Sequence, residues 1–160
     1  MELLIGFLLG VVGSAIAGAW VQPLLSSVPA GWMIRVLARS RDKWRGPLTG
    51  NWSQKWEIRG SESWPDENIS DMEIYQFRQW VVGYWHSISK NGRSSKYSLV
   101  GVVHRESYIV GTWSDVDGLG YMGGFMVKIN PSKDCCEGRY VGHRTSGTIE
   151  AHDWQWVSVD

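Results

Sequence analysis

The sequence predicts an all-β fold, a small eight-stranded antiparallel meander barrel, preceded by an N-terminal transmembrane helix. The chain has 160 residues and a mass of 18.1 kDa, which allows one ordinary domain and a short extension. It begins with a long stretch without charge, and from Gly46 onward it consists of short aromatic and β-branched runs between turn residues. We therefore expect three parts: a transmembrane helix over 1–23, a basic juxtamembrane segment over 24–45 and a cytoplasmic β-barrel domain over 46–160.

The first segment has the length of a membrane-spanning helix. No charged residue occurs from Leu3 to Ile34, which is 32 positions, and a span needs about 20 apolar residues. Leu3 to Val21 meets that need before Pro23 interrupts the run. A cleaved signal peptide is the alternative, but such a peptide has a positive start, and this chain has Glu2 there.

The basic cluster after this helix predicts its orientation. The cluster contains Arg35, Arg39, Arg41, Lys43 and Arg45. By the positive-inside rule, the N-terminus faces outward and the C-terminal domain is cytoplasmic, in a single-pass topology. Within the cluster, Ala30 to Arg45 forms either an amphipathic helix on the lipid surface or a plain linker with solvated charges.

Small residues recur every four positions in the predicted helix. They are Gly6, Gly10, Ser14 and Gly18. Such a ridge lets helix backbones approach closely in lipid, so it favours a homo-oligomer over a monomeric anchor.

Eight strands are predicted after residue 46, and their connections contain Gly, Asn, Asp, Ser or Pro. The expected ranges are Leu48–Ile58, Met72–Phe77, Trp80–Ile88, Tyr97–Val103, Tyr108–Trp113, Tyr121–Ile129, Glu137–His143 and Gly147–Val157. Short sequential strands with tight turns favour a closed barrel, which is either filled by side chains or holds one small ligand. A flattened sandwich is the structural alternative.

The sequence lacks the patterns that catalysis or metal binding requires. The four histidines are scattered, and Cys135 and Cys136 are adjacent, whereas zinc ligands are spaced by two or more residues. The run from Gly118 to Gly123 matches a dinucleotide fingerprint by letters, but it leads into a strand and offers no helix N-terminus to a phosphate. We therefore expect no enzyme, no catalytic residue, no metal and no cofactor.

Ligand binding is better supported than catalysis, because the chain contains 11 tryptophans. Aromatic faces interleaved with arginines can stack a base and neutralise a phosphate. The candidate ligand-binding residues are Arg78, Trp80, Tyr84, Trp85, Arg105, Tyr121, Arg139, Arg144 and Trp156. For each arginine alone, a solvated position on a strand is the simpler interpretation.

The charge of the barrel domain disfavours long nucleic acids. Five of the 16 basic residues and two of the 16 acidic residues precede Gly46, which leaves 11 basic and 14 acidic residues in the domain. A net charge of about −3 opposes a polyanion, whereas a small nucleotide needs only a few local cations.

The architecture resembles a known family. An N-terminal membrane segment (Leu3–Val21) precedes a lipocalin-like barrel with Gly50-Asn51-Trp52, Gly111-Thr112-Trp113 and glycine-rich later strands. These features are similar to those of the membrane-anchored β-barrel effectors of bacterial anti-phage cyclic-oligonucleotide signalling (CBASS). The resemblance implies a barrel that binds a cyclic dinucleotide or oligonucleotide, oligomerises in the bacterial inner membrane and disrupts its lipid, which kills or arrests the infected cell. The chain departs from the family in showing one clear span where two or more are typical.

Two other functions remain open at the level of sequence. One is a membrane-tethered structural or partner-binding barrel without a nucleotide ligand, and the other is a carrier of apolar ligands. They differ in which side chains point inward, and a register error of one residue would invert every strand.

Overall fold

The computed structural model describes residues 35–36, 46–143 and 148–159. The chain divides into two units, 1–33 and 34–160, and all described residues belong to the second. The predicted transmembrane helix, with Gly6, Gly10, Ser14 and Gly18, lies outside the described residues. Within the described part, no helix combines the length and apolar composition that crossing a bilayer requires.

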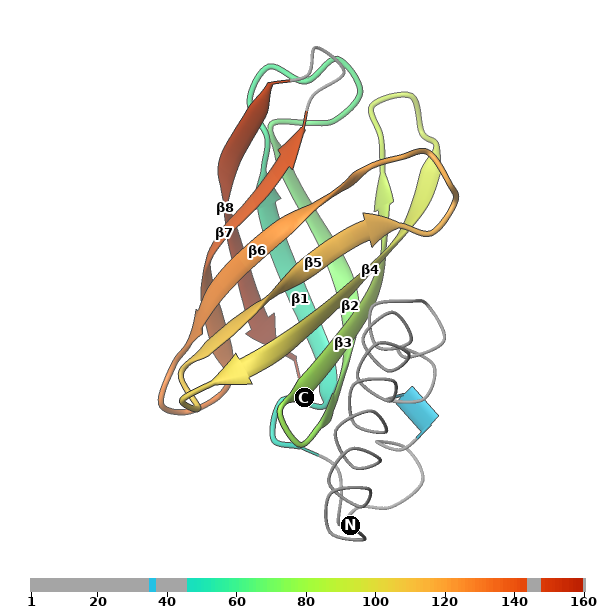
Figure 1. The fold of residues 1–160 in the computed structure, drawn as a ribbon. Helices are drawn as coiled ribbons and strands as arrows, with labels where there is room; N and C mark the ends of the chain where they lie inside the picture. Colours follow the sequence, from blue (N-terminus) through green and yellow to red (C-terminus); the bar gives the residue numbers. More distant parts are fainter. Residues whose placement is uncertain (1–34, 37–45, 144–147, 160) are drawn as a thin grey trace, which may run out of the picture. The chain divides into compact units, whose positions relative to one another are not determined.

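The barrel consists of eight antiparallel strands in sequence order (Figure 1). They are β1 (Gly50–Glu57), β2 (Glu67–Phe77), β3 (Trp80–Ile88), β4 (Ser94–His104), β5 (Tyr108–Asp115), β6 (Met122–Ile129), β7 (Cys135–His143) and β8 (Ile149–Ser158). Each strand pairs with the next, and β1 also pairs with β8 from Trp52↔Ser158 to Trp56↔Trp154. This last ladder closes the barrel, so the predicted closed meander is confirmed and the sandwich alternative is wrong.

Three strands begin earlier than predicted: β2 by five residues, β4 by three and β7 by two. The sequence predicts β2 from Met72, whereas the strand begins at Glu67. The additional residues point polar side chains inward, with Asn68 buried and Ser70 half-buried. They therefore lack the alternation of apolar and polar residues that marks a strand. A hydrophobic pattern cannot reveal a strand whose inward side chains are polar.

The interior is packed at the end where the chain enters β1 and leaves β8, which we call the closed end. Trp52, Ile74, Val81, Ile109, Val127 and Trp156 are at most 2% exposed there. Leu48 covers this end from below the first strand, and its backbone N–H donates to Gln76 Oε1 at 3.1 Å. The turns β2–β3, β4–β5 and β6–β7 also lie at the closed end.

Glycines let neighbouring strands approach closely in the packed half. A Cβ on Gly111 would collide with the Val100 carbonyl oxygen, and one on Gly138 would collide with the Met126 carbonyl oxygen. Only glycine fits where a strand passes this close to its neighbour's backbone, and such sites mark the bends of a small barrel.

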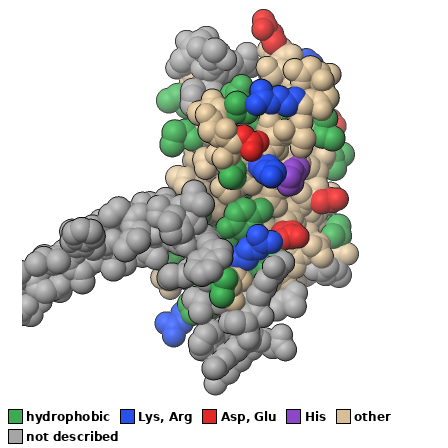
Figure 2. Space-filling model, turned by 90° about the vertical axis from the view of Figure 1, so that its right-hand side faces the viewer, with side chains coloured by type: hydrophobic (Ala, Val, Ile, Leu, Met, Phe, Trp, Pro, Cys, Tyr) green, Lys and Arg blue, Asp and Glu red, His purple; other side chains and the backbone are tan. Residues whose placement is uncertain are grey.

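The outer surface carries mixed charges. On the face shown in Figure 2, basic, acidic and hydrophobic side chains are interspersed over the coloured residues. The coloured residues of that face therefore form no continuous basic patch of the kind that binds a nucleic-acid backbone.

Candidate functional site

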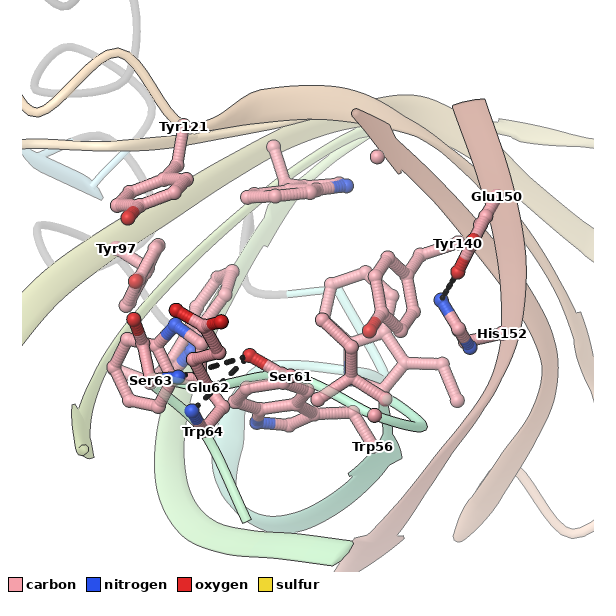
Figure 3. Close-up of a pocket in the computed structure, with 16 residues that line it drawn as sticks. Trp56, Ser61, Glu62, Ser63, Trp64, Tyr97, Tyr121, Tyr140, Glu150 and His152 are labelled. Atoms are coloured by element: carbon pink, nitrogen blue, oxygen red, sulfur yellow. Dashed lines mark hydrogen bonds and ion pairs between the residues drawn. The ribbon is translucent and has the colours of Figure 1, made fainter. Parts of the chain in front are cut away.

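A cavity opens at the opposite end of the barrel, which we call the open end (Figure 3). Its volume is about 360 Å³, at the lower end of the range of small-molecule sites. The lining comes from six strands and two connections and consists of Trp56, Ile58, Gly60, Ser61, Glu62, Ser63, Trp64, Trp85, Tyr97, Trp113, Tyr121, Tyr140, Gly142, Glu150, His152 and Trp154.

Five aromatic side chains form a closed ring of contacts around the cavity, which we call the aromatic ring. Its members, in order, are Trp64, Tyr97, Trp113, Tyr140 and Trp56. Successive ring centroids are 5.6–6.2 Å apart, and their planes cross at 58–85°. Such tilted and edge-to-face pairs are the favoured geometry of neighbouring aromatic rings, so the wall is stable as well as apolar.

Two further tryptophans join this ring to the core. Trp85 stacks on Tyr97, with centroids 5.4 Å apart and planes at 17°, and Trp154 contacts both Trp85 and Tyr140. The indole N–H of Trp154 donates to Gln54 Oε1 at 2.7 Å, and Gln54 Nε2 donates to Ser70 Oγ at 3.0 Å. Because Gln54 is fully buried, this network fixes the orientation of Trp154.

The β1–β2 loop carries Trp64 over the mouth of the barrel. Gly60 makes the turn with φ 65°, and the Ser61 hydroxyl then accepts the backbone N–H groups of Ser63 and Trp64. The neighbouring β3–β4 turn supports the loop, because Lys90 donates through its backbone N–H to the Ser63 carbonyl and through Nζ to the Ser61 carbonyl. Trp64 is consequently 7% exposed although it lies in a loop.

The polar side chains of the lining are two carboxylates, one imidazole and several hydroxyls. Glu62 and Glu150 are its carboxylates, and Glu150 Oε2 lies 3.4 Å from His152 Nε2. Burial raises the pKa of the Tyr97 and Tyr140 hydroxyls well above the usual range, and the Tyr140 hydroxyl donates to the Glu57 carbonyl at 2.7 Å. The lining, all of which is described, contains no lysine or arginine.

The described residues offer no metal centre. Among them, no group of three or more His, Cys, Asp or Glu side chains is placed to hold an ion. Cys135 and Cys136 are free thiols, and burial raises the pKa of Cys136 to about 12, which keeps it a neutral, unreactive core residue.

The structure brings two of the nine predicted ligand-binding residues to this cavity. Trp85 forms part of its floor, and Tyr121, in the β5–β6 connection, stands at its rim. Trp156 is fully buried in the packed half of the barrel.

The predicted arginines lie elsewhere. Arg78 and Arg105 occupy turns at the closed end with φ of 53° and 49°, and Arg139 pairs with Asp153 at 2.9 Å on the outside of β7 and β8. Arg144 lies outside the described residues. The structure therefore does not gather the predicted aromatic and basic groups in one place.

Trp80 and Tyr84 belong to a second, outer cluster on β2–β4. It is centred on Tyr75 and Val82, which alternate with the inward side chains of their strands. The Arg35 guanidinium lies 5.4 Å from the ring centroids of both Tyr75 and Tyr84 and 3.5 Å from Glu73 Oε2. These contacts are cation–π interactions and an ion pair on the outside of the barrel.

Sequence reasoning missed most of the cavity lining, including Trp56, Trp64, Tyr97, Trp113, Tyr140, Glu150, His152 and Trp154. A signal was present, because residues two apart on a strand share a face. Trp52 and Trp56 lie on the inward face of β1, and Trp154 and Trp156 lie on that of β8. The sequence alone did not show which face of each strand points inward, so this parity could not be used.

Comparisons with known proteins support the fold. No protein-family model matches the chain, and no curated protein matches it. Solved β-barrels do: a redesigned β-barrel, b11L5F_LGL, has a TM-score of 0.55 at 7% identity over 71% of this chain and 92% of its own. EF1p2_mFAP2b bound to DFHBI has a TM-score of 0.57 at 6% identity, over 69% and 93%. The redesigned barrel mFAP1, also bound to DFHBI, has a TM-score of 0.53 at 6% identity, over 69% and 94%.

Proposed function

We propose that this protein is a small-molecule receptor that binds a flat organic ligand in the open end of its barrel. The observation that carries the proposal is the aromatic ring, which surrounds a cavity of about 360 Å³. Trp85 and Trp154 form an apolar floor beneath it, so a planar ligand can stack on several faces. The proposal is for binding and not for catalysis.

Similar barrels support this use of the fold. Two of the designed barrels that match this chain are recorded with DFHBI bound, which shows that barrels of this size can hold a small molecule. The sequence leaves two other functions open. A carrier would bind an apolar ligand in the barrel, and a partner-binding module would bind no small ligand there.

A receptor for a cyclic dinucleotide or oligonucleotide is the second candidate, in a membrane-anchored, oligomerising anti-phage effector on the cytoplasmic face of the bacterial inner membrane. Stacking faces such as those of the aromatic ring suit nucleobases. The lining, however, carries Glu62 and Glu150 and no basic side chain to neutralise phosphates. The charge of the lining therefore favours an uncharged or cationic ligand over a cyclic nucleotide.

Isothermal titration of the full-length chain tests the proposal. The panel contains uncharged bicyclic aromatics and cyclic mono-, di- and oligonucleotides, and each binder is measured again with Trp113→Leu, which opens a gap in the aromatic ring. Trp80→Leu, on the outer face, is the matched control. We expect saturable binding of an aromatic that Trp113→Leu weakens by about tenfold, or about 1.4 kcal/mol, while the control leaves it unchanged.

Two results would redirect the assignment. Tight binding of a cyclic nucleotide alone would select the effector. The absence of binding by any compound to a folded barrel would leave the membrane-tethered partner-binding module.

A further inference from the structure

We propose that the open-end cavity is an aromatic cage that selects organic cations, such as a flat quaternary nitrogen heterocycle. This inference rests on the proposed function and adds the ligand's charge to it. Two observations carry the inference: the geometry of the aromatic ring and the sign of the charges in the lining.

The aromatic ring has the dimensions of a cation–π cage. Its five centroids are separated by 5.6–6.2 Å in a closed circuit. A regular pentagon with such sides has its centre about 5 Å from every corner, inside the range of about 6 Å over which a ring attracts a cation. Three of the five members are tryptophans, whose rings attract cations most strongly. A positive group at the centre would therefore lie within reach of several rings at once.

The charged groups of the lining have the complementary sign. Glu62 and Glu150 are the carboxylates that face the cavity, and Figure 3 shows them on opposite sides of it. The side chain of Glu150 is 36% exposed, so water reaches its carboxyl group. An anionic ligand would meet these carboxylates and the negative faces of the rings, whereas a cation is attracted by both.

No neighbouring cation reverses this sign among the lining residues. Lys90 is the basic side chain bonded to the loop that carries Trp64, and its Nζ is held by the Ser61 carbonyl at 2.7 Å. The imidazole of His152 faces the Glu150 carboxylate at 3.4 Å, and no lysine or arginine of the lining lies beside Glu62.

Three ligands of one shape separate charge from stacking. We would titrate the full-length chain at pH 8 with N-methylquinolinium, quinoline and quinoline-4-carboxylate, which are cationic, neutral and anionic. We expect N-methylquinolinium to bind about tenfold more tightly than quinoline, and the carboxylate to bind most weakly. Equal binding of quinoline and its cation would overturn the cation preference and leave the proposed function intact. If neither of these two bound to the folded protein, both proposals would fail.

Charge-neutralising variants test the carboxylates. Glu150→Gln and Glu62→Gln should each weaken N-methylquinolinium by about threefold to tenfold and leave quinoline unchanged. Glu106→Gln removes one carboxylate from the β4–β5 turn at the closed end and should change neither ligand. Equal weakening by all three variants would show a general effect of net charge and would overturn the role of the cage carboxylates.

Discussion

The two ends of the barrel use the same residue types for different purposes. At the closed end, Trp52 and Trp156 are at most 2% exposed and fill the interior together with aliphatic side chains. At the open end, Trp56 and Trp113 are partly buried and stand around a cavity. The number of tryptophans therefore says little about function, because position along the barrel axis decides whether an aromatic ring packs the core or forms a binding wall.

The largest expected effect concerns glycine and compares a backbone collision at the closed end with a side-chain contact at the cavity. Gly138→Ala places a Cβ against the Met126 carbonyl oxygen and 2.6 Å from Val127 Cα, and neither backbone atom can yield without opening the β6–β7 ladder. We expect a loss of about 3 kcal/mol or more in the free energy of unfolding, measured by urea denaturation. Gly142→Ala is the matched variant at the open end, where the new Cβ meets the Trp113 side chain at 3.0 Å.

The Trp113 ring borders the cavity and has room to shift, so Gly142→Ala should cost less than about 1 kcal/mol. Equal destabilisation by the two variants would show that the Trp113 side chain has no more room to shift than the β6–β7 backbone. That result would contradict the distinction between a filled half and a hollow half.

The next effect comes from the network that joins the two halves. Gln54→Leu removes the acceptor of the Trp154 indole N–H and the donor to Ser70 Oγ, both inside the barrel. A buried donor without an acceptor costs about 2 kcal/mol, so urea unfolding should detect a loss of that size. The double variant Gln54→Leu with Trp154→Phe removes the orphaned donor too, and it should recover part of the loss. Strictly additive losses would show that the hydrogen bond contributes nothing.

A cumulative effect should appear at alkaline pH and involves both ends. Burial raises the pKa of Cys136 in the packed half to about 12, and it raises the pKa of Tyr97 and Tyr140 at the cavity. Each raised pKa belongs to a neutral acid in the folded state. From about pH 9 for the thiol and about pH 10 for the hydroxyls, the unfolded chain releases protons that the folded chain retains. Stability should therefore be full below pH 9 and fall above it.

The slope identifies which end is responsible. Each group adds up to about 1.4 kcal/mol per pH unit to the decline once its unfolded form titrates. Urea unfolding at pH 8, 9, 10 and 11 measures that slope. Cys136→Ala should flatten the first part of the decline, and Tyr97→Phe should flatten the part above pH 10. A free energy of unfolding that stays constant from pH 8 to 11 would contradict the burial of all three groups.

The sequence predicts the fold well because each barrel strand has a local sequence pattern. The range Trp80–Ile88 was predicted to the residue, since its aromatic and β-branched side chains end at turn residues. The cavity has no such local pattern, because its lining residues are far apart in the sequence. Trp64 and Tyr97 are 33 positions apart and meet only because the β1–β2 loop folds over the mouth through Gly60 and Ser61. A site that forms only when the barrel closes depends on which face of each strand points inward. Long-range strand pairing sets that face.

The smallest expected effect on stability is also the one that separates the two ends most sharply. Trp113→Phe keeps an aromatic ring in the wall and loses the hydrogen bond from the indole N–H to the Val141 carbonyl, which is 3.1 Å long. That bond is partly exposed, so its loss should lower the free energy of unfolding by less than about 1 kcal/mol. The smaller phenyl ring attracts a cation less than indole does, so titration should show a modest loss of N-methylquinolinium affinity.

Trp156→Phe at the closed end provides the comparison for this last variant. It removes similar volume from a fully buried site in the filled half, so stability should fall by more than in Trp113→Phe, and ligand affinity should not change. Trp113→Phe should thus act mainly on ligand binding, and Trp156→Phe should act mainly on stability. If Trp156→Phe weakened the ligand as much as Trp113→Phe does, the cavity would depend on the whole core. The open end would then not be an independent site built on a rigid, filled base.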